Sequence, residues 1–362
     1  MSGIWGKQLQ VAIFGESHGP AIGITISGLP AGLALDEDKI LVEMARRRPG
    51  QNELTTPRRE EDLPDIVSGY FNGHTTGAPL TALIYNTNTR SKDYSQMRKL
   101  MRPGQTDYPA LKRYDGYNDY RGSGHFSGRI TAPLVFAGAV CQQWLDQYGV
   151  TIGSRICSIG EVKDQAEVDF QKLSREDLLA FRQETLPVLT AGLDEEMARC
   201  IRQAKGQHDA VGGIVETFIL GLEAGYGNPF FNSIESTLAQ LIFSVPATKG
   251  IEFGAGFDIA SMLASEANDN FYYDDEGQVQ TTSLNNGGIV GGMSLGTPIN
   301  FRTAIKAPAS IAKAQATINI ESHENVELEV TGRHDPCIVP RVLPVIEAVT
   351  AIGLMDLILT RS

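Results

Sequence analysis

The stretch LVFAGAVCQQWL, residues 134–145, decides the fold class of this chain. Its apolar residues continue around the whole helical circumference as far as Gln142, whereas a surface helix carries a single apolar stripe. A helix that is apolar on every side has to be covered on every side. The stretch therefore predicts a helix inside the protein, between other layers of secondary structure.

The segments around this helix predict the layers that cover it. Alternating apolar residues predict strands, and apolar residues at helical spacing behind a capping residue predict helices. Strands are expected at residues 10–14, 22–27, 80–85, 213–220 and 326–330. Helices are expected from an N-cap at Asp36 to a stop at Pro49, from Asp194 to Gly206, and over residues 234–243 and 345–359. Because the strands come in pairs with long helices between them, we expect an α+β fold or a layered sheet–helix–sheet arrangement.

Length and composition narrow the class of protein. The chain has 362 residues, of which 42% are hydrophobic, and it holds no fixed repeat or Ser/Gly linker. Length alone suggests about two domains, although one large domain of this size is ordinary. The most apolar window is expected at residues 132–141, about half of the ~20 residues that a membrane span needs. No GxGxxG follows the first strand, so a dinucleotide-binding unit is not supported.

The cysteines and the N-terminus indicate a reducing compartment. None of Cys141, Cys157, Cys200 and Cys337 forms a CxxC pair, and their spacing suits neither a zinc site nor a small disulfide framework. Residues 1–19 show no basic segment followed by an apolar one, so no secretory signal is visible. We expect a soluble cytoplasmic protein with reduced thiols and no bound metal.

The charge distribution points to a small anionic ligand. The chain has 31 Lys and Arg against 43 Asp and Glu, a net charge of −12, which disfavours binding to nucleic acid or to a membrane surface. Fifteen of the 31 basic residues nevertheless lie between Lys39 and Arg129. This cluster indicates either a confined pocket for a small polyanion or solvated arginines on surface helices.

Two motifs near the N-terminus carry groups suited to such a ligand. In GESHG, residues 15–19, flanking glycines let a loop present His18, which can exchange a proton near neutral pH. A histidine in such a loop is also commonly structural, and the motif is not the GxSxG nucleophile elbow. In RRRPG, residues 46–50, the arginines suit bidentate contacts to phosphate or carboxylate, but they also favour the helix dipole.

Glycine-rich segments follow in the middle of the chain. RPGQTDY at residues 102–108 and DYRGSGHFSGR at residues 119–129 combine small residues with charge. NNGGIVGGMS at residues 285–294 is followed by KAPAS at residues 306–310. Such segments either hold a phosphate through backbone N–H groups or form simple turns and strand bulges.

The last motif is GRHDPC, residues 332–337. In an extended run, Arg333 and Asp335 are two residues apart and point to the same side. This arrangement predicts either a cation beside a carboxylate base or a local ion pair.

The order and joint content of these motifs are specific, although each motif alone is ambiguous. GESHG, RRRPG, TTGAP at residues 75–79, RPGQTDY, DYRGSGHFSGR, GGIVGGMS and GRHDPC follow one another along the chain. In this order and at these spacings they resemble the chorismate synthase family over essentially the whole chain. The resemblance implies one domain, residues 1–362, with a β-α-β sandwich fold: a helical layer between two mainly antiparallel sheets. It also implies a homotetramer.

The resemblance further implies a lyase of the shikimate pathway of aromatic amino acid biosynthesis. Members eliminate phosphate from 5-enolpyruvylshikimate 3-phosphate in a 1,4-anti sense to give chorismate, and they need reduced FMN (FMNH2) although the reaction has no net redox change. Because the chain has no long insertions, we expect an outside reductant, with NADPH acting directly or through a separate flavin reductase. The expected partner is a small anionic substrate, with no nucleic acid and no membrane.

The resemblance also implies site residues. His18 is the acid that protonates reduced flavin or assists phosphate departure, Asp335 helps flavin N5 to accept the C6 proton, and Gln105 stands where the family usually has a second catalytic histidine. The substrate-contacting positions fall on Ser17, His18, Arg47, Arg102, Arg129 and Arg333. The FMN contacts fall on His125, Phe126, Ser127, Pro246, Ala247, Gly291, Lys306, Ala307, Pro308, Ala309 and Ser310.

The chain departs from the family pattern at several of these positions. Gln105 cannot titrate, Ser123 replaces a glycine, and His125 replaces an arginine that many members have. Three functions therefore stay open: a working chorismate synthase, a catalytically weakened paralogue that binds FMN or an enolpyruvyl-type anion, and a non-enzymatic anion or nucleic-acid binding protein. The net charge argues against the third.

Overall fold

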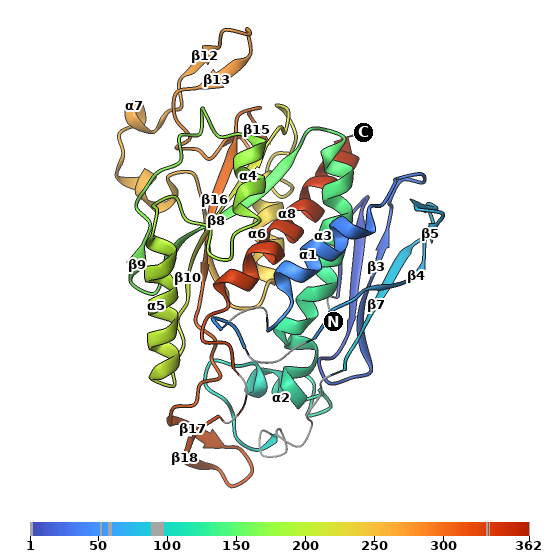
Figure 1. The fold of residues 1–362 in the computed structure, drawn as a ribbon, viewed down its shortest axis with the longest axis vertical. Coiled ribbons are helices and arrows are strands. Elements are labelled where there is room, and N and C mark those ends of the chain that lie inside the picture. The colour runs from blue at the N-terminus through green and yellow to red at the C-terminus, as the bar shows by residue number, and fades with distance from the viewer. Residues whose placement is uncertain are drawn as a thin grey trace.

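Two β-sheets face each other across a layer of helices (Figure 1). The structure is a computed structural model and describes residues 3–50, 53–56, 60–87, 98–330, 332 and 334–361. Neighbouring strands within both sheets run antiparallel. The expected α+β class and β-α-β sandwich are confirmed.

The first sheet has the strand order β1-β2-β3-β7-β4. In that order its strands span Ile4–Trp5, Gln10–Gly15, Ala21–Ser27, Leu80–Tyr85 and Asp65–Ser68. Alternation along β3 puts Ile22, Ile24 and Ile26 on one face, and all three are fully buried against the helical layer. The three strands expected in this region are confirmed to within one residue at each end.

The second sheet has the strand order β11-β16-β10-β8-β9. In that order its strands span Thr248–Phe253, Ile299–Ile305, Gly213–Leu220, Thr151–Ile159 and Val162–Lys163. β10 coincides with an expected strand, whereas β8 and β16 are not expected from the sequence. β8 is buried along nearly its whole length because helices pack on it from both sides, so it lacks the alternation that marks a half-exposed strand.

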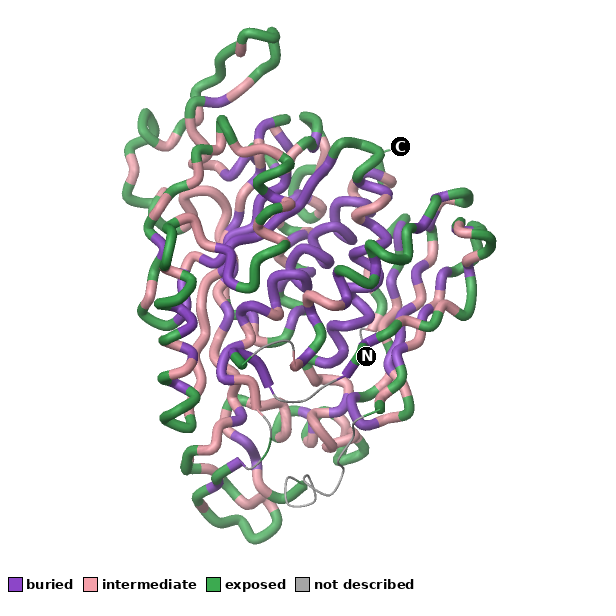
Figure 2. Tube along the Cα trace, in the orientation of Figure 1, coloured by how far each residue is buried: buried purple, intermediate pink, exposed green. Residues whose placement is uncertain are grey.

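The layer between the sheets holds α1 (Glu37–Arg47), α3 (Thr131–Asp146), α6 (Ile234–Ser244) and α8 (Val339–Arg361). α3 packs against strands of both sheets, and the interior of this layer is buried (Figure 2). α3 crosses α8 so closely that a Cβ on Gly138 would lie 2.2 Å from the Cβ of Ala348. The buried helix expected at residues 134–145 is confirmed.

α8 is longer than the sequence predicts. It begins at Val339 rather than at residue 345, and it continues through Pro344. Because proline usually lies at or before a helix start, the sequence pattern places this start too late. α8 is long and apolar enough to cross a membrane, but 94% of its most apolar window is buried inside the protein. It is a core helix, and its apolar window of 18 residues is longer than the ten-residue window expected at residues 132–141.

The other predicted elements differ from the structure only at their ends. Asp36 caps α1 as expected, by accepting a hydrogen bond from the backbone N–H of Lys39. α5 (Leu193–Gly206) is capped by Gly192, so Asp194 lies in its first turn rather than at its start. The strand expected at residues 326–330 is β18 (Glu324–Leu328), which pairs with β17 (Gln315–Asn319) outside the two sheets.

Short elements complete the chain. They are α2 (Asp107–Arg113), α4 (Arg175–Phe181) and α7 (Ala264–Ala267), the 3-10 turns Arg121–Phe126, Gly128–Ile130 and Gly256–Ser261, and the hairpins β5–β6 (Tyr70–Phe71, His74–Thr75), β12–β13 (Phe271–Tyr273, Val279–Thr281) and β14–β15 (Ile289–Val290, Met293–Ser294).

Candidate active site

A cavity of about 580 Å³ opens where α1 ends and where α3 and α8 begin. Arg47, the last residue of α1, Thr131, the first of α3, and Val342, near the start of α8, all line it. This volume lies within the range of small-molecule and cofactor pockets, about 300–1,000 Å³. The end of the helical layer thus forms the floor of a ligand-sized site.

Most of the residues implied by the sequence resemblance meet in this cavity. They come from segments that are far apart in the chain and that meet at this end of the sandwich. The implied residues that line the cavity are His18, Arg47, Arg102, Gln105, Phe126, Ser127, Arg129, Pro246, Ala247, Lys306, Ala307, Pro308, Ala309, Ser310 and Asp335.

His18 is held tightly by its own neighbour and by the glycine-rich turn. Its Nδ1 lies 3.0 Å from Oγ of Ser17, and that hydroxyl also lies 2.9 Å from the carbonyl oxygen of Gly122. A Cβ on Gly122 would be 2.3 Å from Cε1 of His18, so only glycine fits beneath the ring. Ser17 does not line the cavity. It orients the imidazole from behind.

Two of the cavity arginines share one buried carboxylate. Nη1 of Arg47 donates to Oδ2 of Asp62 at 2.8 Å, and Nη1 of Arg129 donates to Oδ1 at 2.6 Å. Glu60 forms a further ion pair with Arg129 at 2.5 Å. Burial lowers the pKa of Arg47 to about 10, although Asp62 raises it, so Arg47 is still charged near pH 7. These ion pairs fix the positions of the two guanidinium groups at the cavity wall.

The third arginine is fixed from the other side. Nε and Nη2 of Arg102 donate to the two carboxylate oxygens of Asp107 at 2.8 and 2.7 Å. Nη2 also donates to Oγ of Ser123 at 3.0 Å. This bidentate pairing fixes the plane of the guanidinium before any ligand arrives.

Each oxygen of the Asp335 carboxylate has a hydrogen-bond partner. The backbone N–H of Thr56 donates to Oδ1 at 2.8 Å, and Nη1 of Arg341 donates to Oδ2 at 2.7 Å. Nε of Arg341 also donates to the carbonyl oxygen of Arg47 at 3.1 Å. Arg341 therefore ties the carboxylate to the end of α1. Arg333, expected beside Asp335, lies outside the described residues.

The loops carrying Gln105 and Lys306 are joined to each other. Nε2 of Gln105 donates to Oγ of Ser310 at 3.0 Å, and Nζ of Lys306 donates to the carbonyl oxygen of Gly104 at 2.7 Å. Burial lowers the pKa of Lys306, and the nearby charge of Lys249 lowers it further. Two lysines that repel each other at a cavity wall form a favourable place for an anion.

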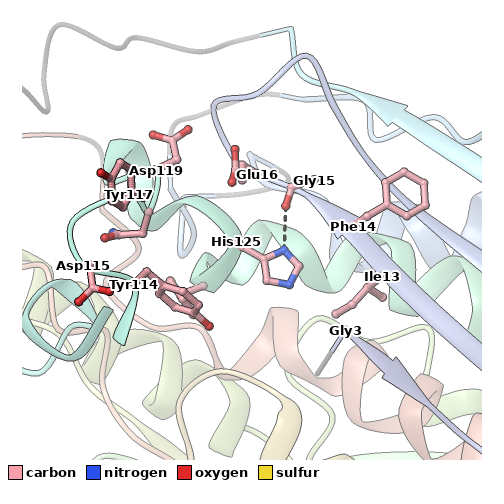
Figure 3. Close-up of a pocket in the computed structure, with 12 residues that line it drawn as sticks. Gly3, Ile13, Phe14, Gly15, Glu16, Tyr114, Asp115, Tyr117, Asp119 and His125 are labelled. Atoms are coloured by element: carbon pink, nitrogen blue, oxygen red, sulfur yellow. Dashed lines mark hydrogen bonds between the residues drawn. The ribbon is translucent and has the colours of Figure 1, made fainter. Parts of the chain in front are cut away.

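Two of the implied FMN contacts do not line this cavity. His125 lines a second cavity of about 590 Å³, in which its Nδ1 donates to the carbonyl oxygen of Gly15 at 2.8 Å (Figure 3). Gly291 lies in the turn between β14 and β15. Tyr226, whose backbone N–H donates to Ser294 of β15, stacks on Arg361 at the far end of α8. The structure thus separates Gly291 from the site by the length of that helix.

Comparison with known proteins agrees with this constellation. The family model described as chorismate synthase matches residues 9–359. The chain belongs to the chorismate synthase family. Its relatives include the chorismate synthase of Methanocaldococcus jannaschii, 44% identical with 98% of this chain and 96% of the relative covered. The chorismate synthase of Dehalococcoides mccartyi is 43% identical with 99% and 97% covered.

The fold of a solved chorismate synthase is also similar to this structure. A crystal structure of chorismate synthase aligns with a TM-score of 0.76 at 28% identity, covering 99% of this chain and 93% of that one. Full-length similarity in both sequence and fold gives this chain chorismate synthase function.

Sequence reasoning missed several residues that shape this chorismate synthase site. Asp62 and Glu60 form part of an acidic run that resembles an exposed loop, and only the tertiary fold places them between arginines. Lys249 and Arg341 line the cavity beside expected residues. Arg341 could have been found, because only three residues separate it from GRHDPC and it carries a charge at the start of an otherwise apolar helix.

Proposed function

We propose that the cavity binds 5-enolpyruvylshikimate 3-phosphate beside reduced FMN and eliminates phosphate to give chorismate, as a carbon–oxygen lyase. The observation that carries the proposal is the convergence of Arg47, Arg102 and Arg129 on one cavity together with His18 and Asp335. The substrate has one phosphate and two carboxylates, and arginine is the side chain best suited to bind such groups.

The cavity suits FMN by the chemistry of its walls. Val245, Pro246 and Ala247 give an apolar wall for a flat ring, while Lys249 and Lys306 provide positive charge for a phosphate. The backbone from Ala307 to Ser310 adds polar groups beside these lysines. Reduced FMN, when bound, would lend electron density to the substrate and recover it, so that the reaction has no net redox change.

The residues of this chain have separable tasks in the elimination. The C3–O bond breaks and phosphate leaves with the bonding electrons, while C6 loses its proton and the C6–H electron pair stays in the ring. The existing double bond shifts toward C3, so that the ring gains the second double bond of chorismate. The arginines bind the substrate anions and stabilise the departing phosphate. His18 supplies a proton on the phosphate side, and Asp335 assists removal of the C6 proton. Gln105 cannot titrate, so it binds and orients rather than transfers a proton.

The wider setting of this activity is also a proposal. We expect the chain to act in the cytoplasm as one domain within a homotetramer, with electrons supplied by NADPH directly or through a separate flavin reductase. The alternative, a weakened paralogue that binds FMN or an enolpyruvyl-type anion, rests on Gln105. Turnover distinguishes the two.

Flavin binding tests the assignment of the lysines. Lys249→Met combined with Lys306→Met should weaken binding of photoreduced FMN about tenfold or more, because two charged partners of its phosphate are lost. Reduced riboflavin, which lacks the phosphate, should bind both proteins equally. Lys163→Met, at an exposed lysine of β9, is the control. Equal loss of FMN and riboflavin binding would show that the lysines do not contact the phosphate.

A further inference from the structure

Ser123 has a backbone conformation that serine rarely adopts. Its φ is +68°, between Gly122 at +55° and Gly124 at +50°. Neither glycine position has room for a side chain. A Cβ on Gly122 would lie 2.3 Å from Cε1 of His18, and a Cβ on Gly124 would lie 2.2 Å from the carbonyl oxygen of Asp119. A third glycine would remove the strain at position 123. The hydroxyl group is what the serine adds, so strain here indicates a role for that group.

The hydroxyl of Ser123 helps to hold Arg102. Nη2 of Arg102 donates to Oγ at 3.0 Å, while Nε and Nη2 also donate to Asp107. Among the residues that the structure describes, none accepts a hydrogen bond from Nη1 of Arg102 or from the O–H of Ser123. Ser123 and Arg102 both line the cavity. Two neighbouring donors therefore face a site in which an anion is expected.

We propose that Ser123 and Arg102 form a subsite for one anionic group on the shikimate ring of the substrate, either the phosphate or the ring carboxylate. Because Oγ already accepts a hydrogen bond from Arg102, the hydroxyl hydrogen is left to donate to the ligand. Nη1 of Arg102 supplies the adjacent charged donor. Ser123 is thus both a ligand contact and a positioning residue for Arg102. This inference rests on the proposed function and adds a residue to it.

Binding of shikimate 3-phosphate tests the subsite without catalysis. Ser123→Ala keeps the backbone strain and removes the hydroxyl, whereas Ser123→Gly removes both. A hydrogen bond to a charged group corresponds to about a 10–100-fold change in affinity. Both variants should therefore bind shikimate 3-phosphate at least about tenfold more weakly than wild type, with an unchanged Kd for photoreduced FMN. Ser322→Ala, at an exposed serine, should bind as wild type does.

Steady-state kinetics separates this role from a structural one. With 5-enolpyruvylshikimate 3-phosphate, both Ser123 variants should raise KM about tenfold or more and leave kcat within about threefold, because the lost contacts bind the ligand rather than transfer a proton. Urea unfolding should give Ser123→Ala a wild-type midpoint, since Asp107 still holds Arg102. Ser123→Gly should have a midpoint no lower than wild type, because it also relieves the backbone strain at position 123.

The bound group is identified by comparing two ligands. If the subsite holds the phosphate, shikimate, which lacks it, binds wild type and variants equally. If it holds the ring carboxylate, shikimate binding weakens as well. A Kd for shikimate 3-phosphate within twofold of wild type in both variants would overturn the inference, even in an active enzyme. Ser123-dependent binding without any chorismate formation would instead overturn the proposed function and leave the subsite standing.

Discussion

Replacing Asp62 by Asn changes charge at nearly constant shape and should destabilise the folded chain by about 3–5 kcal/mol. Asp62 is 3% exposed and pairs with Arg47 and Arg129, which are 4% and 6% exposed. Asn can still accept one hydrogen bond, but its NH2 group faces the second guanidinium. Arg47 then loses Asp62 as its counter-charge, and Arg129 keeps Glu60 alone. The expected loss of stability follows from the buried positive charge that Asp62 no longer balances.

The pH dependence of this loss has a definite sign. Burial alone would raise the pKa of Asp62, but Arg47 and Arg129 outweigh burial and hold it below the ordinary value of 3.8. A lowered pKa stabilises the fold above the unfolded-state value, and that contribution is lost as pH falls through the folded-state value. The difference between wild type and Asp62→Asn should therefore be constant from about pH 5 to 8 and shrink below about pH 4.

Urea unfolding measures the effect directly. With an m-value of about 3 kcal/mol/M, a loss of about 3–5 kcal/mol lowers the midpoint by about 1–1.7 M. Asp275→Asn, at an exposed aspartate of the β12–β13 hairpin, should stay within about 0.5 kcal/mol of wild type. A shift below about 1 kcal/mol for Asp62→Asn at pH 7 would refute the claim that this carboxylate neutralises the two arginines.

Two further substitutions test other parts of the site. Gly122→Ala should lower the free energy of unfolding in urea by about 2–4 kcal/mol, since φ is +55° and the new Cβ would meet the His18 ring. Gly128→Ala, which has open space at its Cβ, should stay within about 0.5 kcal/mol of wild type. Equal effects of the two substitutions would contradict the packing argument. Asp335→Asn keeps the Thr56 contact but loses the charge, so anaerobic assays should show kcat reduced by about 100-fold or more with unchanged FMN affinity. A kcat within about threefold of wild type would remove Asp335 from the mechanism.

The sequence pattern correctly predicted the elements whose formation depends on residues close to one another in the chain. Residues 134–145 are apolar around the whole helix, and only an interior layer accommodates such a surface. Asp36 caps its helix by a contact within four residues. The sequence did not predict β8, because a strand buried on both faces lacks the alternation of apolar and polar residues. It placed the start of α8 too late, because Pro344 lies inside that helix.

The residues of the site likewise include some that the sequence predicted and some that only the folded structure brings together. Motif order identified the residues that line the cavity, because each motif carries its own charged or small residues. The counter-charges come from other segments: Asp62 reaches Arg47 and Arg129 only in the closed fold, and Arg341 reaches Asp335 across a helix start. His125 lies in the loop for which the resemblance implies FMN contacts, but its ring turns to Gly15 and a different cavity. Side-chain direction is a tertiary property that motif content does not determine.

The central claim is that His18, Asp335 and the three arginines suffice for the elimination with Gln105 in place of a histidine. An anaerobic single-turnover experiment tests it most directly, with protein, photoreduced FMN and 5-enolpyruvylshikimate 3-phosphate mixed while phosphate, chorismate and the flavin spectrum are followed. Gln105→His is measured alongside. Both proteins should form stoichiometric phosphate and chorismate at similar rates. Binding of flavin and substrate by both proteins, with turnover by Gln105→His alone, would contradict it.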